Sequence, residues 1–138
     1  MAASLYLAYV MHGDVLHVLG APGGSLAGLR PVGTFTPDWP AVHAAAERIR
    51  ALVHHAADAG EVSSSATVEL EDLGGFLFDE LVPLPAKRWL RDGAGDGELT
   101  LSLPPELLGL PWELLHMGRE ALCLRWAMGR ALQLDAEP

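Results

Sequence analysis

The stretch Leu110-Pro111-Trp112-Glu113-Leu114-Leu115 decides the fold prediction, because it stands between two strand-like runs. Before it, Leu99–Leu103 alternates apolar and polar residues, which is typical of a strand with one buried face. After it, Ala121–Trp126 is a second short apolar run. We therefore predict strands over residues 99–103 and 121–127. The compact Leu/Pro/Trp stretch between them, Glu106–His116, is predicted to form single helical turns.

The N-terminal part of the chain predicts a β-hairpin over residues 4–20. Leu5–Val10 and Val15–Gly20 are rich in strand-forming side chains, and Gly13-Asp14 between them supplies turn chemistry. Leu26–Thr36 predicts a weaker third strand. Pro31 confines that strand to an edge, because proline has no N–H to give to a neighbour.

A first long helix is predicted over residues 39–59. Asp38 is placed to cap its free N–H groups, Pro40 lies in the first turn where a missing donor costs little, and Gly60 is placed to end it. Apolar residues recur between these limits at steps of three and four, which predicts one buried face.

A second helix is predicted over residues 68–82, with Thr67 as its cap and Pro83 as its stop. Gly74-Gly75 in its middle indicates either a break or a close approach by another backbone. The order of hairpin, two helices and two strands predicts an α/β fold with a mixed sheet. At 138 residues, the chain is expected to form a single domain over 1–138.

Composition excludes several classes of function. The chain has 18 acidic residues against 9 Lys and Arg, a formal charge of −9, which disfavours binding to nucleic acid. The one cysteine, Cys123, rules out an internal disulfide and fits a reducing compartment. The N-terminus has no basic region typical of a signal peptide, and no apolar run is long enough to span a membrane. We expect a cytoplasmic protein.

Charged residues and tryptophans in and after the quoted stretch are candidates for a structural role or for a protein interface. Glu113 follows Trp112 in apolar surroundings and needs a cationic partner, for which Arg125 and Arg130 are available. We expect such a pair to hold the turn on the sheet. Trp112 and Trp126 are expected to be core residues, with a partner interface as the alternative.

Other chemically capable residues predict no site. Cys123 lies in an apolar run and is expected to be a core residue, not a nucleophile. His43 and Glu47 share a helix face at i and i+4, as metal ligands can, but no third ligand is obvious, and a solvated face explains them better. We predict no catalytic residue, no cofactor and no metal.

The pattern from residue 99 to 130 resembles the CHAT family, caspase-like proteases often fused to tetratricopeptide repeats in bacteria. That family typically shows a strand, an "lPWElL" segment, a second strand with a "fLal"-like run, and then an arginine. The corresponding residues are Leu99–Leu103, Leu110–Leu115, Ala121–Leu124 and Arg130. The N-terminal hairpin, the long helix and Leu81-Val82-Pro83-Leu84 are also similar to the start of a CHAT domain.

The resemblance covers only the first, non-catalytic half of such a domain. The family's catalytic histidine and cysteine belong to the second half, so no residue here inherits a catalytic role. The expected function is a non-catalytic CHAT-like module that binds or regulates a caspase-like protease in bacterial defence or stress signalling. The alternative is the N-terminal part of a longer CHAT cysteine protease. A small-molecule sensor is a third hypothesis, although the sequence displays no convergent polar pocket.

Overall fold

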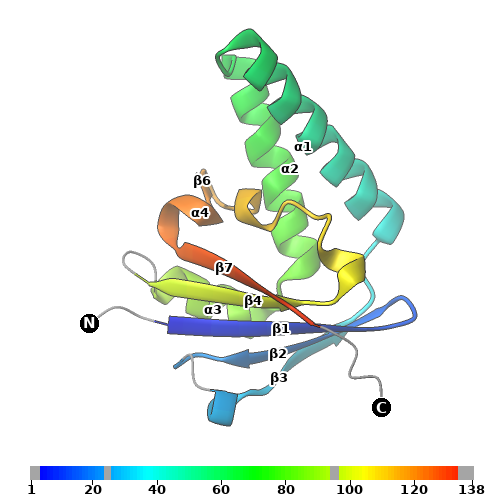
Figure 1. Cartoon of the computed structure of the whole chain (residues 1–138), viewed down its shortest axis with the longest axis vertical. Helices are drawn as coiled ribbons and strands as arrows, with labels where there is room; N and C mark the ends of the chain where they lie inside the picture. Colours follow the sequence, from blue (N-terminus) through cyan, green and yellow to red (C-terminus); the bar gives the residue numbers. More distant parts are fainter. Residues whose placement is uncertain (1–3, 24–25, 94–96, 134–138) are drawn as a thin grey trace.

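The computed structural model describes residues 4–23, 26–93 and 97–133, and Figure 1 shows it as a five-stranded mixed sheet with helices packed against it. The strand order is β3-β2-β1-β4-β7. The elements are β1 (Ser4–His12), β2 (Val15–Ala21), β3 (Arg30–Phe35), α1 (Trp39–Ala59), α2 (Ser64–Leu81), α3 (Leu84–Asp92), β4 (Glu98–Leu103), β5 (His116–Met117), β6 (Glu120–Ala121), α4 (Leu122–Arg125) and β7 (Ala127–Leu132). This confirms the predicted α/β class.

The hairpin forms as predicted. β1 and β2 pair antiparallel from Tyr6 opposite Ala21 to His12 opposite Val15, and the turn between them uses Gly13 at a φ of +62°, which favours glycine. β3 pairs with β2 and is an edge strand, as Pro31 requires. The register between β2 and β3 shifts between Val18 and Leu19.

The sheet continues on the other side of β1 with parallel strands. β1 pairs parallel with β4 and β4 pairs parallel with β7. Leu99, Leu101 and Leu103 of β4 are almost fully buried, as their alternation predicts. Leu99 and Leu101 lie in register with Leu5 and Leu7 of β1, so one face of the sheet carries the core.

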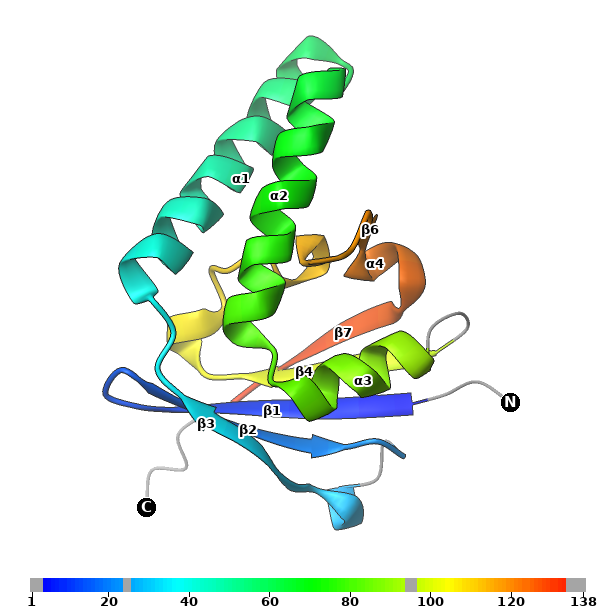
Figure 2. The same cartoon turned by 180° about the vertical axis from the view of Figure 1, so that it is seen from behind.

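The two long helices form an antiparallel pair that rises from the sheet (Figure 2). α1 begins and ends as predicted, because the Asp38 carboxylate accepts a hydrogen bond from Ala41 N at 3.2 Å and Gly60 adopts a φ of +77°. The predicted start of the second helix is wrong. α2 begins at Ser64, because Ser63 Oγ takes the capping role by accepting from Ala66 N, and Thr67 lies inside the helix.

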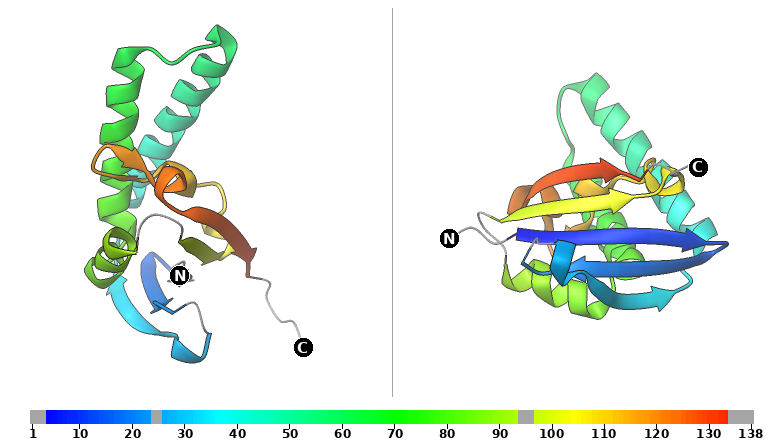
Figure 3. Two further views of the ribbon diagram at one scale, coloured as in Figure 1. Left: turned by 90° about the vertical axis from the view of Figure 1, so that its left-hand side faces the viewer. Right: turned by 60° about the horizontal axis from the view of Figure 1, so that its bottom comes forward.

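The α-helices of the described residues lie on one side of the five-stranded sheet (Figure 3). Figure 3 shows the opposite side in its right-hand view, with the strands in front of the α-helices. Arg48 of α1 and Glu69 of α2 form an exposed ion pair that joins the long helices. The result is a two-layer α/β arrangement with the core between the layers.

The predicted strand over residues 121–127 is wrong. Its apolar run forms the single turn of α4, and the strand follows at β7. The helical turn places Leu122 and Trp126, four residues apart, in the core. It therefore turns Cys123 and Leu124 outward, so the prediction that Cys123 is a core residue is also wrong.

Candidate functional site

The stretch Leu110–Leu115, called the Pro-Trp-Glu segment below, packs against the sheet through Trp112. The Trp112 ring is 1% exposed, lies 4.8 Å from the Tyr9 ring between centroids, and donates its indole N–H to Leu107 O at 2.9 Å. Trp126 is 3% exposed and donates to Leu90 O at 3.0 Å. Both tryptophans are core residues, as expected, so neither offers its ring to a partner.

Glu113 of this segment is held by Arg130 of β7. Arg130 Nε donates to Glu113 Oε2 at 2.8 Å, and Nη2 donates to Oε1 at 2.5 Å, which is a two-point contact between the planar groups. Arg130 also donates to the carbonyl oxygens of Leu108 and Leu110. The predicted pairing of Glu113 with a cation is confirmed, and Arg130 is the partner.

The other candidate partner of Glu113 lies elsewhere. Arg125 of α4 approaches Glu120 of β6, with 3.6 Å between Nη1 and Oε1. The Arg130 hydrogen bonds lower the pKa of the Glu113 carboxyl group below its usual value, against a smaller opposing effect of burial. Glu113 is therefore charged at neutral pH and fastens the Pro-Trp-Glu segment to the last strand.

Gly74 shows why this segment can lie so close to α2. A Cβ at Gly74 would stand 2.2 Å from His116 Nδ1 and 2.4 Å from Leu114 O, which is far inside contact distance. At Gly75 a Cβ would meet nothing within 4 Å. Of the two predicted meanings of the Gly-Gly pair, close approach of another backbone is therefore the one observed, and it occurs at Gly74.

β7 forms an edge of the sheet, and half of its backbone groups face away from β4. Ala127 N donates to Gly97 O at 2.9 Å and Gln133 N donates to Leu103 O at 3.0 Å. Because backbone groups alternate in direction along a strand, the odd-numbered residues of β7 face β4. The N–H and C=O groups that face the open edge belong to Met128, Arg130 and Leu132.

The last described residue of the chain also fixes β7 in place. The Gln133 side-chain amide donates to Tyr9 O at 2.9 Å, to Ser102 O at 3.0 Å and to Ser102 Oγ at 2.9 Å. It therefore reaches across β4 to β1. Gln133 thus fixes the C-terminal end of β7, and the Arg130 contacts fix its middle.

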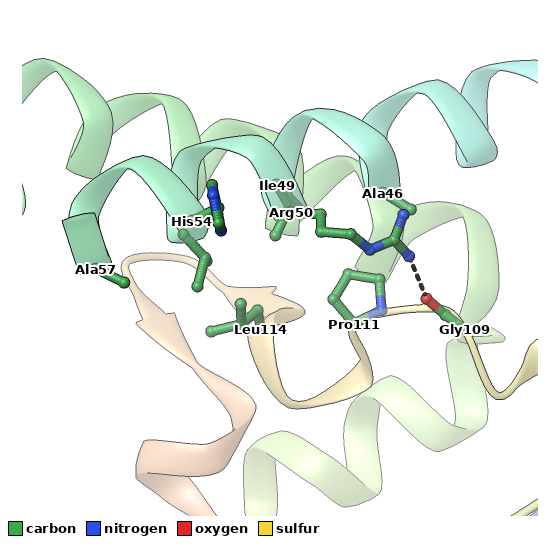
Figure 4. Close-up of a pocket in the computed structure, with 9 residues that line it drawn as sticks. Ala46, Ile49, Arg50, His54, Ala57, Gly109, Pro111 and Leu114 are labelled. Carbon is green, nitrogen blue, oxygen red and sulfur yellow. Dashed lines mark hydrogen bonds between the residues drawn. The ribbon is translucent and has the colours of Figure 1, made fainter.

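An apolar groove of about 420 Å³ lies on the other side of the Pro-Trp-Glu segment, against α1 (Figure 4). Pro111 and Leu114 form one wall, and Ile49 and neighbouring residues of α1 form the other. Arg50 bridges the walls by donating from Nη2 to Gly109 O at 3.0 Å. The Pro-Trp-Glu segment thus borders both the groove and the open edge strand.

The residues with catalytic or metal-binding chemistry do not come together. Within the described ranges, no hydrogen bond joins Cys123 to a histidine, and no group of three or more His, Cys, Asp and Glu is arranged for a metal ion. His43 stacks on Trp39 at 6.0 Å between ring centroids. Glu47, its partner in the hypothetical metal pair, contacts Arg50 instead.

A second pocket was not foreseen from the sequence. It is lined by basic residues of α3 and α4 and by His116 of β5. The sequence carries no signal for it, because these residues are widely spaced along the chain and meet only when α3 and α4 fold onto α2.

Comparison of the chain with protein-family models, with curated proteins and with solved structures gave no match. None of the helices in the described part of the chain combines the length and the apolar character needed to cross a lipid bilayer.

Proposed function

We propose that this chain is a non-catalytic, CHAT-like module that binds and regulates a caspase-like cysteine protease, in bacterial defence or stress signalling. The observation that carries the proposal is the open parallel edge of β7. An edge strand presents a row of N–H and C=O groups that can pair with a strand of another chain. A strand of a partner is the simplest structure that satisfies its backbone groups.

The fixed position of β7 supports this role. The Arg130 and Gln133 side chains hold the strand through seven hydrogen bonds to residues of other elements and of the sheet. A strand that is already ordered loses little conformational entropy when it binds. We expect the partner strand to run along Met128–Leu132 and the Pro-Trp-Glu segment to act as the fixed support behind it.

The same proposal assigns no peptidase activity to this chain alone. A cysteine protease needs a thiolate beside an imidazole together with donors for the oxyanion. Cys123 lies on the outer side of α4, and the histidine nearest to it in sequence, His116, uses Nδ1 to contact Leu114 O. The catalytic pair would therefore come from the protease partner.

The experiment compares two substitutions at one residue of the open edge. Leu132→Pro removes an outward-facing N–H and adds a ring in the path of a pairing strand, while Leu132→Ala keeps the N–H. The partner to be tested is any caspase-like chain encoded next to this one, and binding is measured by titration calorimetry. We expect Leu132→Pro to weaken binding at least about tenfold and Leu132→Ala to change it less than about threefold.

Two results would refute the proposal. One is that no caspase-like chain encoded nearby binds the wild-type protein. The other is that Leu132→Pro binds as tightly as Leu132→Ala while both retain the wild-type circular dichroism spectrum, because then the edge strand plays no part.

The alternative is that this chain forms the N-terminal part of a longer CHAT cysteine protease. The open edge of β7 favours it as well, since the strand that pairs there can belong to the same polypeptide. The coding sequence decides between them. A reading frame that continues past the codon for Pro138 into a His-Gly pair and a cysteine-bearing strand establishes the protease, whereas a stop codon there excludes it.

A further inference from the structure

The unforeseen pocket, called the basic pocket below, has a volume of about 660 Å³ and lies where α3 and α4 meet α2 and the β5–β6 hairpin. Lys87 and Arg91 project into it from α3, Arg125 from α4 and His116 from β5. Its size is that of a small-molecule site. No residue of β7 lines it, so it is separate from the edge proposed for the protein partner.

The charge of the pocket is opposite to that of the chain. The sequence carries nine Lys and Arg residues and a net charge of −9, yet three of the nine cations meet here. One carboxylate, Asp79, also lines the pocket and contacts Lys87 Nζ at 3.0 Å, and Glu120 of β6 lies 3.6 Å from Arg125 Nη1. Arg91 has no ion pair within the described residues. The positive charge is therefore only partly compensated by the protein.

His116 adds a buried polar group to the same wall. His116 is buried, and its Nδ1 lies 2.8 Å from Leu114 O. Because a carbonyl oxygen can only accept, Nδ1 carries the proton, and the ring is fixed with Nε2 as the other polar atom. Nε2 makes no hydrogen bond to the described residues. The neutral ring offers a lone pair at Nε2, and the protonated ring offers a donor.

The rest of the lining is apolar. Phe78 of α2, Leu84 of α3 and Met117 of β5 lie beside the charged groups. Lys87 Nζ stands 5.6 Å from the centroid of the Phe78 ring, which keeps the ammonium group over the aromatic face. The pocket thus offers cations together with an apolar surface that a flat organic group can contact.

We propose that the basic pocket binds a small organic phosphate, a molecule with one or two phosphate groups attached to an apolar or aromatic part. Two arginines and a lysine match the multiple charge of phosphate, and the planar guanidinium groups can each contact two of its oxygens. Phe78, Leu84 and Met117 contact the organic part. This inference goes beyond the proposed function and does not depend on it.

The test is a calorimetric titration of the purified chain with two probes at about 0.15 M salt, where weak surface attraction is screened. Inorganic pyrophosphate presents the phosphate groups alone, and ADP presents the same groups on a flat organic part. We expect both to bind, and ADP to bind more tightly because it also contacts the apolar lining. Succinate, a dianion without phosphate, is expected to bind more weakly than either.

A matched pair of variants locates the site. Arg91→Glu reverses a charge in the pocket at an exposed residue without an ion pair in the described chain, and Arg88→Glu makes the same change on the same helix outside the pocket. We expect Arg91→Glu to raise the Kd of ADP at least about tenfold, as the loss of a charge-assisted contact does. Arg88→Glu is expected to raise it less than about threefold.

Three results would overturn the proposal. Neither probe binds at millimolar concentration, succinate binds as tightly as pyrophosphate, or the two charge reversals weaken ADP binding equally. Equal affinity for ADP and pyrophosphate would contradict the assigned role of the apolar lining. Because both substituted residues are exposed on α3, circular dichroism is expected to show that both variants fold.

Discussion

The two edges of the sheet, β3 and β7, are built in opposite ways. β3 contains Pro31, which has no N–H to offer, and its register against β2 shifts at Val18 and Leu19. α3 packs against it, and the Arg30 guanidinium lies 5.4 Å from the Trp89 ring centroid. β7 contains no proline and pairs with β4 over its full length. One edge resists pairing with another strand, and the other invites it.

The difference shows that an open edge can be fixed without being covered. β7 is held from behind, by the Arg130 contact with Glu113 and by the segment that Gly74 allows to pack closely. Its outward backbone groups have no hydrogen-bond partner among the described residues, because Arg130 and Gln133 hold the strand through their side chains. The two edges can therefore be told apart by the contacts that support each of them.

The largest expected effect comes from removing the space behind the Pro-Trp-Glu segment. Gly74→Ala places a methyl group against Leu114 O and the His116 ring, so we expect it to lower the free energy of unfolding by about 2–4 kcal/mol. Gly75→Ala is the control, with open space around its Cβ, and is expected to raise it by up to about 1 kcal/mol. Urea denaturation measures both, and equal effects would show that the close approach is unimportant.

Breaking the contact between Glu113 and Arg130 is expected to loosen β7 and leave β3 unchanged. Glu113→Gln removes the charge, and because the pair is partly exposed we expect a loss of about 1–2 kcal/mol. Hydrogen exchange of the β7 amides is expected to speed up, with β3 amides unaffected. Glu69→Gln, at the exposed ion pair between α1 and α2, is the control and should have a smaller effect.

Acid provides a reversible form of the same experiment. The pKa of Glu113 is lower in the folded chain than its usual 4.5, so its contribution to stability is complete above that value and disappears as the pH falls through the folded pKa. We expect the wild-type protein to lose more stability than Glu113→Gln between pH 5 and the acid limit of folding. If the free energy of unfolding falls with pH equally in the two proteins, Arg130 does not stabilise the carboxylate.

Replacement of Tyr9 in β1 is expected to raise the stability of the protein. Its hydroxyl group is buried beside Trp112 with no hydrogen-bond partner among the described residues, and burial raises its pKa. Tyr9→Phe removes an unsatisfied polar atom, so we expect the free energy of unfolding to rise by up to about 1 kcal/mol. A clear loss of stability in thermal unfolding would indicate that the hydroxyl group has a partner in solution.

The smallest expected effect is at the β3 edge. Arg30→Gln removes the cation from the Trp89 ring and is expected to cost about 0.5 kcal/mol, the usual value for such a contact at an exposed site. Binding of a partner at β7 should not change. A change in binding as large as that of Leu132→Pro would mean that the two edges are not independent.

The sequence predicts those elements whose signals are local. The first long helix has its cap, its proline and its terminal glycine within its own residues, and the hairpin has its turn. The sequence predicts a later start for the second helix than the structure has, because three consecutive serines and a threonine can all cap it and Ser63 is the residue that does. The run from Ala121 to Trp126 has strand-forming composition, yet its core contacts at Leu122 and Trp126 follow helical spacing.

The candidate site was predictable only in part. The need of Glu113 for a cation follows from its apolar neighbours, but the choice of Arg130 over Arg125 depends on the register of β7 against β4, which no local pattern contains. The basic pocket depends on packing between helices that are distant in sequence. The CHAT-like function stays a prediction that the binding experiments test.

The central position of β1 has a consequence for the order in which the protein is made. Its antiparallel neighbour β2 is synthesised directly after it, whereas its parallel neighbour β4 is synthesised only after both long helices. At ribosomal rates of about 5–20 residues per second, the free side of β1 waits on the order of 10 s for its partner. During that time the nascent hairpin is a natural client for a chaperone.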